Sequence, residues 1–183
     1  CAERLSDVHG KGGEGATGPQ AEGARCLQGA QAHGRVEGAG VVTAVGEGVT
    51  RFAPGDRVAY ASRPIGSYAS VRNLPVNLLL HLPDAVSFEQ AAAATLQGLT
   101  AHMLVNRVTH LQSGDCALVH AAAGGLGLLL VQWLKHRGCR VIGTTGSEAK
   151  AQLARDHGCD EVILYNEEPF TEGVKRLTGG KGV

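Results

Sequence analysis

The stretch Val119-His120-Ala121-Ala122-Ala123-Gly124-Gly125-Leu126-Gly127 is a run of small residues between an apolar segment and an amphipathic one. The preceding residues Cys116–Val119 have the pattern of a buried strand, and Leu128–Arg137 have that of a helix. The turn therefore places backbone N–H groups at a helix N-terminus, where phosphate binds favourably. Within it, Ala122-x-Gly124-x-x-Gly127 matches the dinucleotide-binding fingerprint, with alanine in place of the first glycine. A tight turn without a ligand is the alternative.

After this turn the sequence alternates between strand and helix patterns. Beyond the first helix, the predicted elements are a strand over Arg140–Thr144, a helix capped by Ser147 through Asp156, a strand over Glu161–Tyr165 and a helix over Pro169–Leu177. Three successive βα units predict an α/β fold whose parallel sheet is the first half of a doubly wound sheet. The later run Gly179-Gly180-Lys181 lacks the other residues of a phosphate loop and is predicted to be a turn.

The residues from Glu37 onward predict a β-rich unit followed by helices. The predicted strands cover Val41–Val45, Arg57–Tyr60, Ser67–Val71 and Asn77–Leu82. Ser87 and Gln90 have the spacing of a capping box, which predicts a helix over Phe88–Ala94. A second helix is expected over Leu96–Val105, interrupted by Gly98.

Residues 1–36 differ in composition from the rest of the chain. They contain no aromatic residue and few large aliphatic residues, and neither a period of 2 nor one of 3.6 is visible. This composition predicts a disordered segment, or a non-native one translated from a shifted reading frame. A folded segment whose pattern is poorly visible is the alternative.

Composition excludes several classes of partner. The chain has 183 residues, of which 17 are basic and 17 acidic, so no nucleic-acid or membrane-surface partner is expected. No apolar run approaches the roughly 20 residues that span a bilayer. The five cysteines form an odd number without CxxC spacing, which favours reduced thiols and a cytoplasmic location over a disulfide framework.

Four motifs occur in an order and spacing that resemble one family: Glu37-Gly38-Ala39-Gly40-Val41-Val42, Gly55-Asp56-Arg57-Val58, Leu96-Gln97-Gly98-Leu99-Thr100-Ala101 and His120–Gly127. Together they resemble the zinc-independent, zeta-crystallin-like quinone oxidoreductases of the medium-chain dehydrogenase/reductase superfamily. The resemblance implies a partial GroES-like substrate domain over residues 37–94 and the N-terminal half of an NADPH-binding Rossmann domain over 95–183. Residues 1–36 stay unassigned. It also implies hydride transfer from NADPH to quinones or electron-poor enones, and a homo-oligomeric full-length protein.

The resemblance also implies a set of cofactor residues. Gly124, Gly125, Leu126 and Gly127 would cradle the pyrophosphate. The second strand ends without the acidic residue that an NAD-preferring site needs, which leaves room for a 2′-phosphate. The family places cofactor contacts at positions matching Thr100, Gly146, Ser147, Lys150 and Tyr165. Ordinary alternatives are a solvated lysine for Lys150, a packing role for Tyr165, and for Thr100 a bond to its own i−4 carbonyl.

Zinc and a catalytic acid or base are not expected. Where zinc-dependent relatives have Gly-His-Glu, this chain has Arg35-Val36-Glu37, and valine cannot ligate a metal. Nothing before Val36 matches the family, and its members continue beyond Val183, so the resemblance implies an incomplete form with little or no turnover. The alternatives are an enoyl reductase module of a polyketide synthase and an inactive nucleotide-binding fragment.

Overall fold

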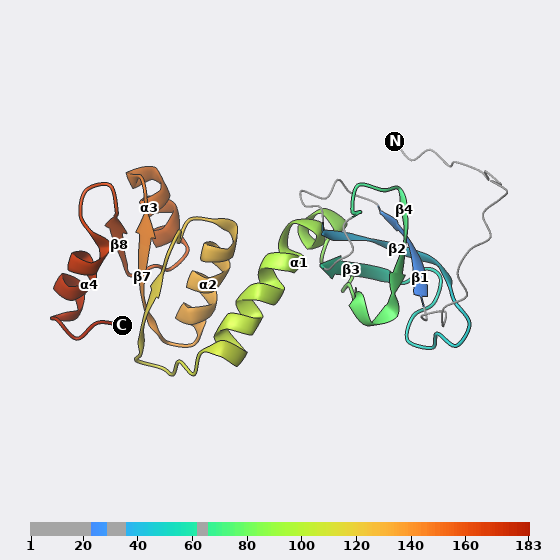
Figure 1. The fold of residues 1–183 in the computed structure, drawn as a ribbon, viewed down its shortest axis with the longest axis horizontal. Coiled ribbons are helices and arrows are strands. Elements are labelled where there is room, and N and C mark those ends of the chain that lie inside the picture. Colours follow the sequence, from blue (N-terminus) through green and yellow to red (C-terminus); the bar gives the residue numbers. More distant parts are fainter. Residues whose placement is uncertain (1–22, 29–35, 62–65) are drawn as a thin grey trace, which may run out of the picture.

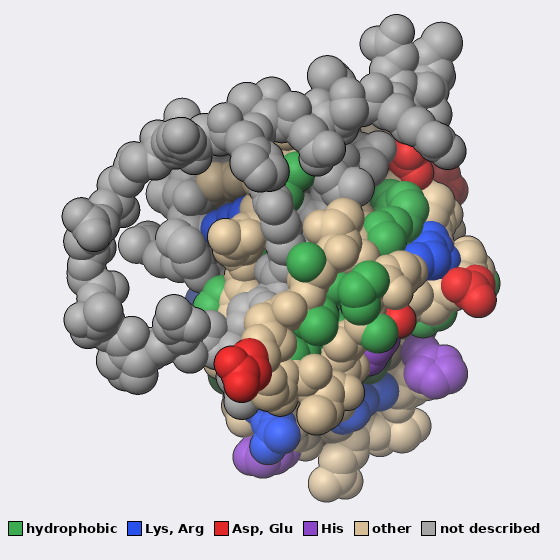
Figure 2. Space-filling model, turned by 90° about the vertical axis from the view of Figure 1, so that its right-hand side faces the viewer, with side chains coloured by type: hydrophobic (Ala, Val, Ile, Leu, Met, Phe, Trp, Pro, Cys, Tyr) green, Lys and Arg blue, Asp and Glu red, His purple; other side chains and the backbone are tan. Residues whose placement is uncertain are grey.

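The computed structural model describes the backbone of residues 23–28 and, with side chains, residues 36–61 and 66–183. Two sheets lie at opposite ends of the molecule, and the long helix α1 (Phe88–Met103) joins them (Figure 1). The end formed by the first sheet carries acidic and basic side chains interspersed with apolar ones (Figure 2). Within the described residues, no helix is long and apolar enough to cross a membrane.

The first sheet is antiparallel and has the strand order β4-β1-β2-β3-β5. Its strands are β1 (Gly23–Gln28), β2 (Glu37–Val45), β3 (Arg57–Ala61), β4 (Val71–Pro75) and β5 (Leu79–His81). Apolar side chains of this sheet and its loops form one buried cluster, which contains Val42, Phe52, Val58, Tyr60, Leu74 and Leu79. Successive side chains of a strand point to opposite faces, so Val58 and Tyr60 of β3 join this cluster while Ala59 between them packs in a second cluster with Ala91 and Ala92 of α1.

Strand β1 corrects part of the expectation for residues 1–36. Gly23–Gln28 pairs with β2 on one side and with β4 on the other, so the disorder prediction is wrong for these six residues. The physical reason is that an inner strand gains backbone hydrogen bonds along both edges, whatever its side-chain pattern. The rest of the 1–36 prediction lies outside the described residues, apart from Val36.

Two strand positions differ from the prediction. The strand expected over Ser67–Val71 lies four residues later, as β4, where pairing with β1 places Leu74 in the core and leaves Tyr68 74% exposed. The strand expected over Asn77–Leu82 shrinks to β5, because residues 76–78 form a 3₁₀ turn. In both places the pairing partner decided the register, and local alternation did not.

Helix α1 is continuous, so the predicted interruption at Gly98 is wrong. The capping box is confirmed: Gln90 N donates to Ser87 Oγ at 3.2 Å, and Ser87 N donates to Gln90 Oε1 at 2.9 Å. A glycine costs a helix only about 1 kcal/mol, and the packing of α1 against β2, β3 and α2 exceeds that cost. A single π-helical turn, Leu104–Val108, follows α1. The predicted domain boundary at residues 94 and 95 falls inside this helix.

The second sheet is parallel, with the order β6-β7-β8, which confirms the predicted βα succession. Its elements are β6 (Cys116–Val119), α2 (Gly125–His136), β7 (Arg140–Thr145), α3 (Glu148–Asp156), β8 (Glu161–Leu164) and α4 (Phe170–Thr178). Val131 of α2 and Ala154 of α3 belong to one buried cluster, whereas Val174 of α4 packs with Ile142 and Ile163 in another. The sheet is thus covered by helices on both faces.

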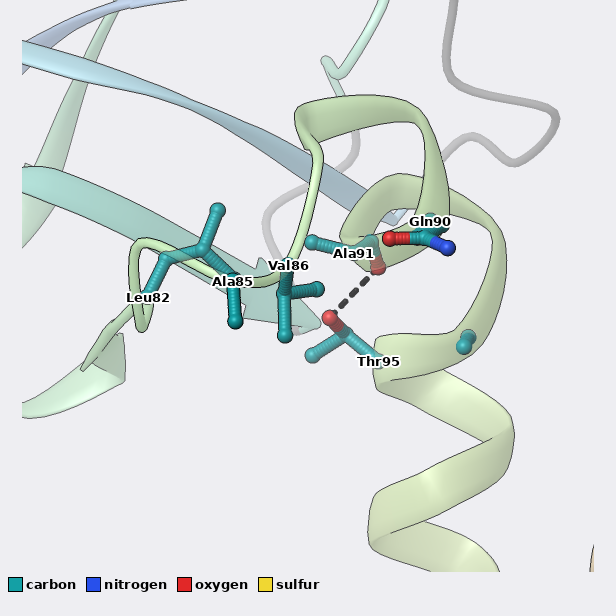
Figure 3. Close-up of a pocket in the computed structure, with 7 residues that line it drawn as sticks. Leu82, Ala85, Val86, Gln90, Ala91 and Thr95 are labelled. Carbon is teal, nitrogen blue, oxygen red and sulfur yellow. Dashed lines mark hydrogen bonds between the residues drawn. The ribbon is translucent and has the colours of Figure 1, made fainter.

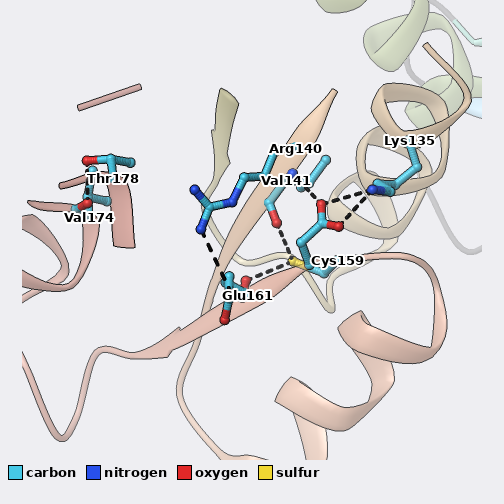
Figure 4. A network of polar contacts seen from close by, with 8 residues as sticks. Lys135, Arg140, Val141, Cys159, Glu161, Val174 and Thr178 are labelled. Atoms are coloured by element: carbon cyan, nitrogen blue, oxygen red, sulfur yellow. Dashed lines mark hydrogen bonds and ion pairs between the residues drawn. The ribbon is translucent and has the colours of Figure 1, made fainter. Parts of the chain in front are cut away.

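A polar network ties together the edge of this sheet where its strands begin (Figure 4). Lys135 Nζ donates to both carboxylate oxygens of Asp160, at 2.8 and 3.0 Å, and Val141 N donates to one of them at 2.7 Å. Nearby, Cys159 Sγ donates to Glu161 O at 3.1 Å. Burial raises the pKa of the Cys159 thiol, which keeps it protonated at neutral pH.

Asp160→Asn should lower the melting temperature at pH 7 by about 1–4 °C, because it removes the ion pair with Lys135. Burial raises the pKa of Asp160, but hydrogen bonds from Lys135 and Val141 outweigh it and leave the pKa below its ordinary value. A depressed folded-state pKa gives stability that is present above the unfolded pKa, about 3.9, and is lost as the pH falls through the folded value.

Thermal melts from pH 7 down to about 2.5 test this prediction. The difference between wild type and Asp160→Asn should shrink below about pH 3.9. The exposed Glu167→Gln serves as the control, since its carboxylate makes no side-chain hydrogen bond or ion pair among residues 36–61 and 66–183. A difference that stays constant across this pH range would contradict the ionic explanation.

Candidate functional site

The turn between β6 and α2 is held tightly against the neighbouring strand. Ala122 N donates to Thr144 O of β7 at 3.1 Å, and Gly124 N donates to Ala121 O at 2.8 Å. Ala121 has a φ of 50°, the only positive φ of a non-glycine residue among those described. Such a conformation costs of order 1 kcal/mol and persists where the surrounding structure imposes it, as it often does at ligand sites.

Gly127 is required by the close approach of α2 to this turn. A Cβ on Gly127 would lie 2.8 Å from Ala122 Cα and closer still to Ala121 O. Gly124 is less restricted, because its Cβ would lie 3.2 Å from Ala121 O. The third glycine of the fingerprint is therefore explained by packing between backbone segments, which is the role it has in dinucleotide-binding turns.

The N-terminus of α2 offers uncapped donors to an anion. Its N-cap is Gly124, which has no side chain to cap the helix, and no acidic residue lies in the first turn. The N–H groups of Gly125, Leu126 and Gly127 precede the first i−4 bond along the helix, which runs from Leu128 N to Gly124 O at 2.8 Å. Unpaired donors and the helix dipole together suit a phosphate group.

The ends of β7 and β8 bring four predicted residues to one edge of the sheet. Gly146 and Ser147 follow β7, Lys150 lies exposed in the first turn of α3, and Tyr165 follows β8. A Cβ on Gly146 would lie 2.5 Å from the Tyr165 hydroxyl. Asn166 Nδ2 also donates to Gly146 O at 2.8 Å, so residues after β8 shape the loop after β7.

Ser147 and Lys150 have side chains that are open to a ligand. Ser147 occupies the N-cap position of α3 as predicted, but its side chain makes no capping hydrogen bond, so that part of the prediction is wrong. Its extended backbone and exposure leave the hydroxyl at the surface. The Lys150 ammonium has no ion-pair partner among the described residues. These two groups suit a second phosphate better than a ribose hydroxyl.

Thr100 lies on α1, and its hydroxyl donates to Leu96 O at 2.8 Å. This is the back-bonding alternative that the sequence left open. The oxygen can still accept a hydrogen bond, but within the described residues it makes no hydrogen bond to the β6–α2 turn. A role for Thr100 at the cofactor stays a prediction.

Three residues that contact either the turn or α1 were given no role in the sequence analysis. His120 Nδ1 lies 3.1 Å from Thr144 Oγ1, and its ring packs edge-on against Phe170, with centroids 4.9 Å apart. Gln97 places its carboxamide against Gly125, and Glu37 accepts a hydrogen bond from Leu96 N. Glu37 and Gln97 lie inside two of the four motifs noted in the sequence. Their contacts, with Leu96 and Gly125, join residues far apart in the chain, so no local sequence pattern predicts them.

An apolar groove of about 510 Å³ lies beside the start of α1 (Figure 3). It is lined by Leu82, Ala85, Val86, Gln90, Ala91, Ala94 and Thr95. A side-chain hydrogen bond from Thr95 Oγ1 to Ala91 O, at 2.6 Å, satisfies the only hydroxyl among these residues. None of the predicted cofactor residues lines it, so the groove and the turn are separate features.

No group of three or more His, Cys, Asp or Glu side chains that could hold a metal ion occurs within residues 36–61 and 66–183. The described cysteines, Cys116, Cys139 and Cys159, are all unpaired. Burial raises the pKa of Cys139 as it does for Cys159, so both thiols are protonated at neutral pH.

Comparisons with known proteins point to one family. A family model described as zinc-binding dehydrogenase matches residues 125–183. Over 145 residues the chain is 51% identical to a quinone oxidoreductase of Pseudomonas aeruginosa. The aligned segment makes up 79% of this chain and 45% of that protein. A highly reducing polyketide synthase of Didymella fabae is 38% identical over 149 residues, 80% of this chain and 8% of the synthase.

Solved structures agree with these sequence matches. The crystal structure of Escherichia coli quinone oxidoreductase complexed with NADPH matches with a TM-score of 0.85 and 36% identity. The matched region covers 92% of this chain and 58% of the chain in that crystal structure. The chain spans about half the length of the curated quinone oxidoreductases that it matches.

Proposed function

Because this chain belongs to the quinone oxidoreductases of the medium-chain dehydrogenase/reductase superfamily, we propose that it binds NADPH for the reduction of quinones or related electron-poor enones. The observation that carries this proposal is the close approach of Gly127 to the Ala121 turn, beneath an uncapped helix N-terminus. That arrangement fits a dinucleotide diphosphate, and the similar solved structure is a complex with NADPH.

The predicted residues divide between the two phosphate-bearing parts of the proposed site. The N–H groups of Gly125, Leu126 and Gly127 hold the diphosphate, with Gly124 keeping the helix N-terminus open. The Ser147 hydroxyl and the Lys150 ammonium bind the 2′-phosphate that distinguishes NADPH from NADH. Tyr165, whose hydroxyl lies against Gly146, contacts the cofactor at its ribose or phosphate. Thr100 stands on the helix that faces α2.

The proposed chemistry is direct hydride transfer without zinc. NADPH supplies the hydride when it is bound, and the protein supplies orientation and exclusion of water. We assign no residue as a general acid or base for this step. We further propose residues 37–94 as the substrate-side unit, residues 95–183 as the cofactor unit, a homo-oligomeric assembly and a cytoplasmic location.

The test is a fluorescence titration of the 183-residue chain with NADPH and with NADH. We expect binding of both and tighter binding of NADPH, unchanged after dialysis against a chelator. Failure to bind either coenzyme would contradict the proposed site, and equal affinities would contradict the 2′-phosphate assignment. In an assay with 1,4-benzoquinone, turnover approaching the ~10 per second of a typical enzyme would contradict only the expectation of little turnover.

An enoyl reductase module is the second candidate function. The match to the polyketide synthase of Didymella fabae favours this candidate. The matched segment forms only 8% of that protein, so there it is one part of a much longer chain. The encoding DNA on either side discriminates between the two. Flanking ketoreductase or carrier-protein sequence would identify a module, whereas a free-standing reading frame would support the quinone oxidoreductase.

A further inference from the structure

The carboxamide of Gln97 occupies the space where residue 125 would carry a side chain. A Cβ built on Gly125 would lie closest to Gln97 Oε1, 2.7 Å from Cδ and 2.9 Å from Nε2. Gly125 is the first residue of α2, so the amide stands beside the uncapped N–H groups of the turn. The glycine at 125 is thus explained by a side chain that arrives from another helix.

This amide makes no hydrogen bond within the part of the chain that the structure describes. Gln97 is half-buried, and a primary amide carries two donors and one acceptor that need partners. A half-turn of the amide exchanges its oxygen and nitrogen, so an N–H can face the mouth of the turn. An unpaired donor at an anion-binding helix end is itself suited to an anion.

Glu37 holds α1 at the residue next to Gln97. Its side chain, at the start of β2, is only 6% exposed, and Oε2 accepts a hydrogen bond from Leu96 N at 2.8 Å. On the same strand, Ala39 packs against Ala91 and Ala92 of α1, where small side chains let helix and sheet approach closely. The carboxylate therefore sets the position of α1 relative to the first sheet.

We propose that Gln97 is a further ligand of the coenzyme diphosphate and that Glu37 is the positioning residue that keeps it there. The inference rests on the proposed NADPH site. Leu96 is clamped to β2 by Glu37, and the following residue reaches α2 at Gly125. The amide N–H then adds a side-chain donor to the backbone donors of the turn. Glu37, a residue of the first sheet, acts on the cofactor site only indirectly, through the position of α1.

The first experiment measures dissociation constants of Gln97 variants by fluorescence titration. Gln97→Ala should weaken NADPH and NADH alike by about tenfold, the loss of one hydrogen bond to a charged group. Gln97→Glu should weaken both further, because it places a like charge beside the diphosphate, and added salt should reduce that penalty. Gln132→Ala and Gln132→Glu, at an exposed position of α2 further along the helix, are the matched controls and should bind as wild type.

Adenosine 2′-phosphate separates a ligand role from a structural one. It carries the 2′-phosphate but no diphosphate, so Gln97→Ala should not change its affinity in a displacement titration. An equal loss for NADPH and adenosine 2′-phosphate would mean that Gln97 only supports the fold and would overturn the inference. Unchanged NADPH binding in Gln97→Ala would overturn it too, with the proposed function intact. A wild-type chain that binds no coenzyme would instead refute the proposed function.

Glu37 is tested through its coupling to Gln97. Glu37→Gln keeps an acceptor for Leu96 N and should bind NADPH within about twofold of wild type, whereas Glu37→Ala should weaken NADPH and NADH by about fivefold. The double variant Glu37→Ala/Gln97→Ala should bind NADPH as Gln97→Ala does, because the Gln97 amide that Glu37 positions is already absent. Additive losses in the double variant would overturn the positioning role. If Glu37→Ala does not fold, the Glu37→Gln result decides, and a large loss there overturns the assignment.

Discussion

Gly127→Ala is expected to raise the dissociation constant for NADPH more than about a hundredfold and to lower the free energy of unfolding by about 2–3 kcal/mol. The added methyl group would lie 2.8 Å from Ala122 Cα and closer still to Ala121 O. These are backbone atoms, and the hydrogen bond from Ala122 N to Thr144 O ties them to β7. The turn must therefore shift, and the donors aimed at the diphosphate shift with it. Fluorescence titration and urea denaturation measure the two effects.

Gly98→Ala is the matched control for this substitution. A Cβ on Gly98 would meet no atom within 4 Å, and the residue lies inside α1. We expect unchanged NADPH affinity and a gain in stability of about 0.5–1 kcal/mol, since alanine loses less backbone entropy in a helix than glycine. A folded Gly127→Ala protein that binds NADPH as tightly as wild type would show that the turn is not the coenzyme site.

Lys150→Glu is expected to reverse the coenzyme preference. It should weaken NADPH by about a hundredfold, because it removes a cation and adds a like charge beside the 2′-phosphate, while NADH affinity changes little. Lys150→Ala, which only removes the cation, should give a loss of about tenfold. Titrations with both coenzymes at low and high salt measure these changes, and salt should narrow the differences.

Lys175→Glu controls for net charge. It makes the same charge change on α4, whose buried face packs on the other side of the sheet from α3. It should leave the affinities for both coenzymes within about twofold of wild type, since Lys175 forms an ion pair with Glu172 on its own helix. Equal weakening of NADPH and NADH by Lys150→Glu would place this lysine elsewhere than at the 2′-phosphate.

The second sheet and its turn were predictable because their signals are local. The strand, turn and helix around Gly127 are encoded within about twenty residues, and each helix in this part begins and ends within a few residues of its prediction. The same holds for the capping box of α1, where Ser87 and Gln90 bond to each other across three residues. Local hydrogen bonding and periodicity suffice for such elements.

The first sheet was predicted less well because its strands depend on partners. Paired residues of β1 and β4 lie 44 or more positions apart in the sequence, as Leu27 with Val71 shows, and neither strand has a clear alternation. Gly98 looked like a break because propensity favours one, but packing on two sides kept α1 intact. Long-range pairing and burial outweigh a local preference of about 1 kcal/mol.

The sequence by itself determined the parallel βα succession and the glycine turn, since both follow from short-range periodicity and from the small size of residues 121–127. Only the tertiary structure decided which side chains meet at that turn. Glu37 and Leu96 are 59 positions apart, and Gln97 reaches Gly125 from a different helix. Such contacts arise when separate elements pack, and no local pattern of residue types records them.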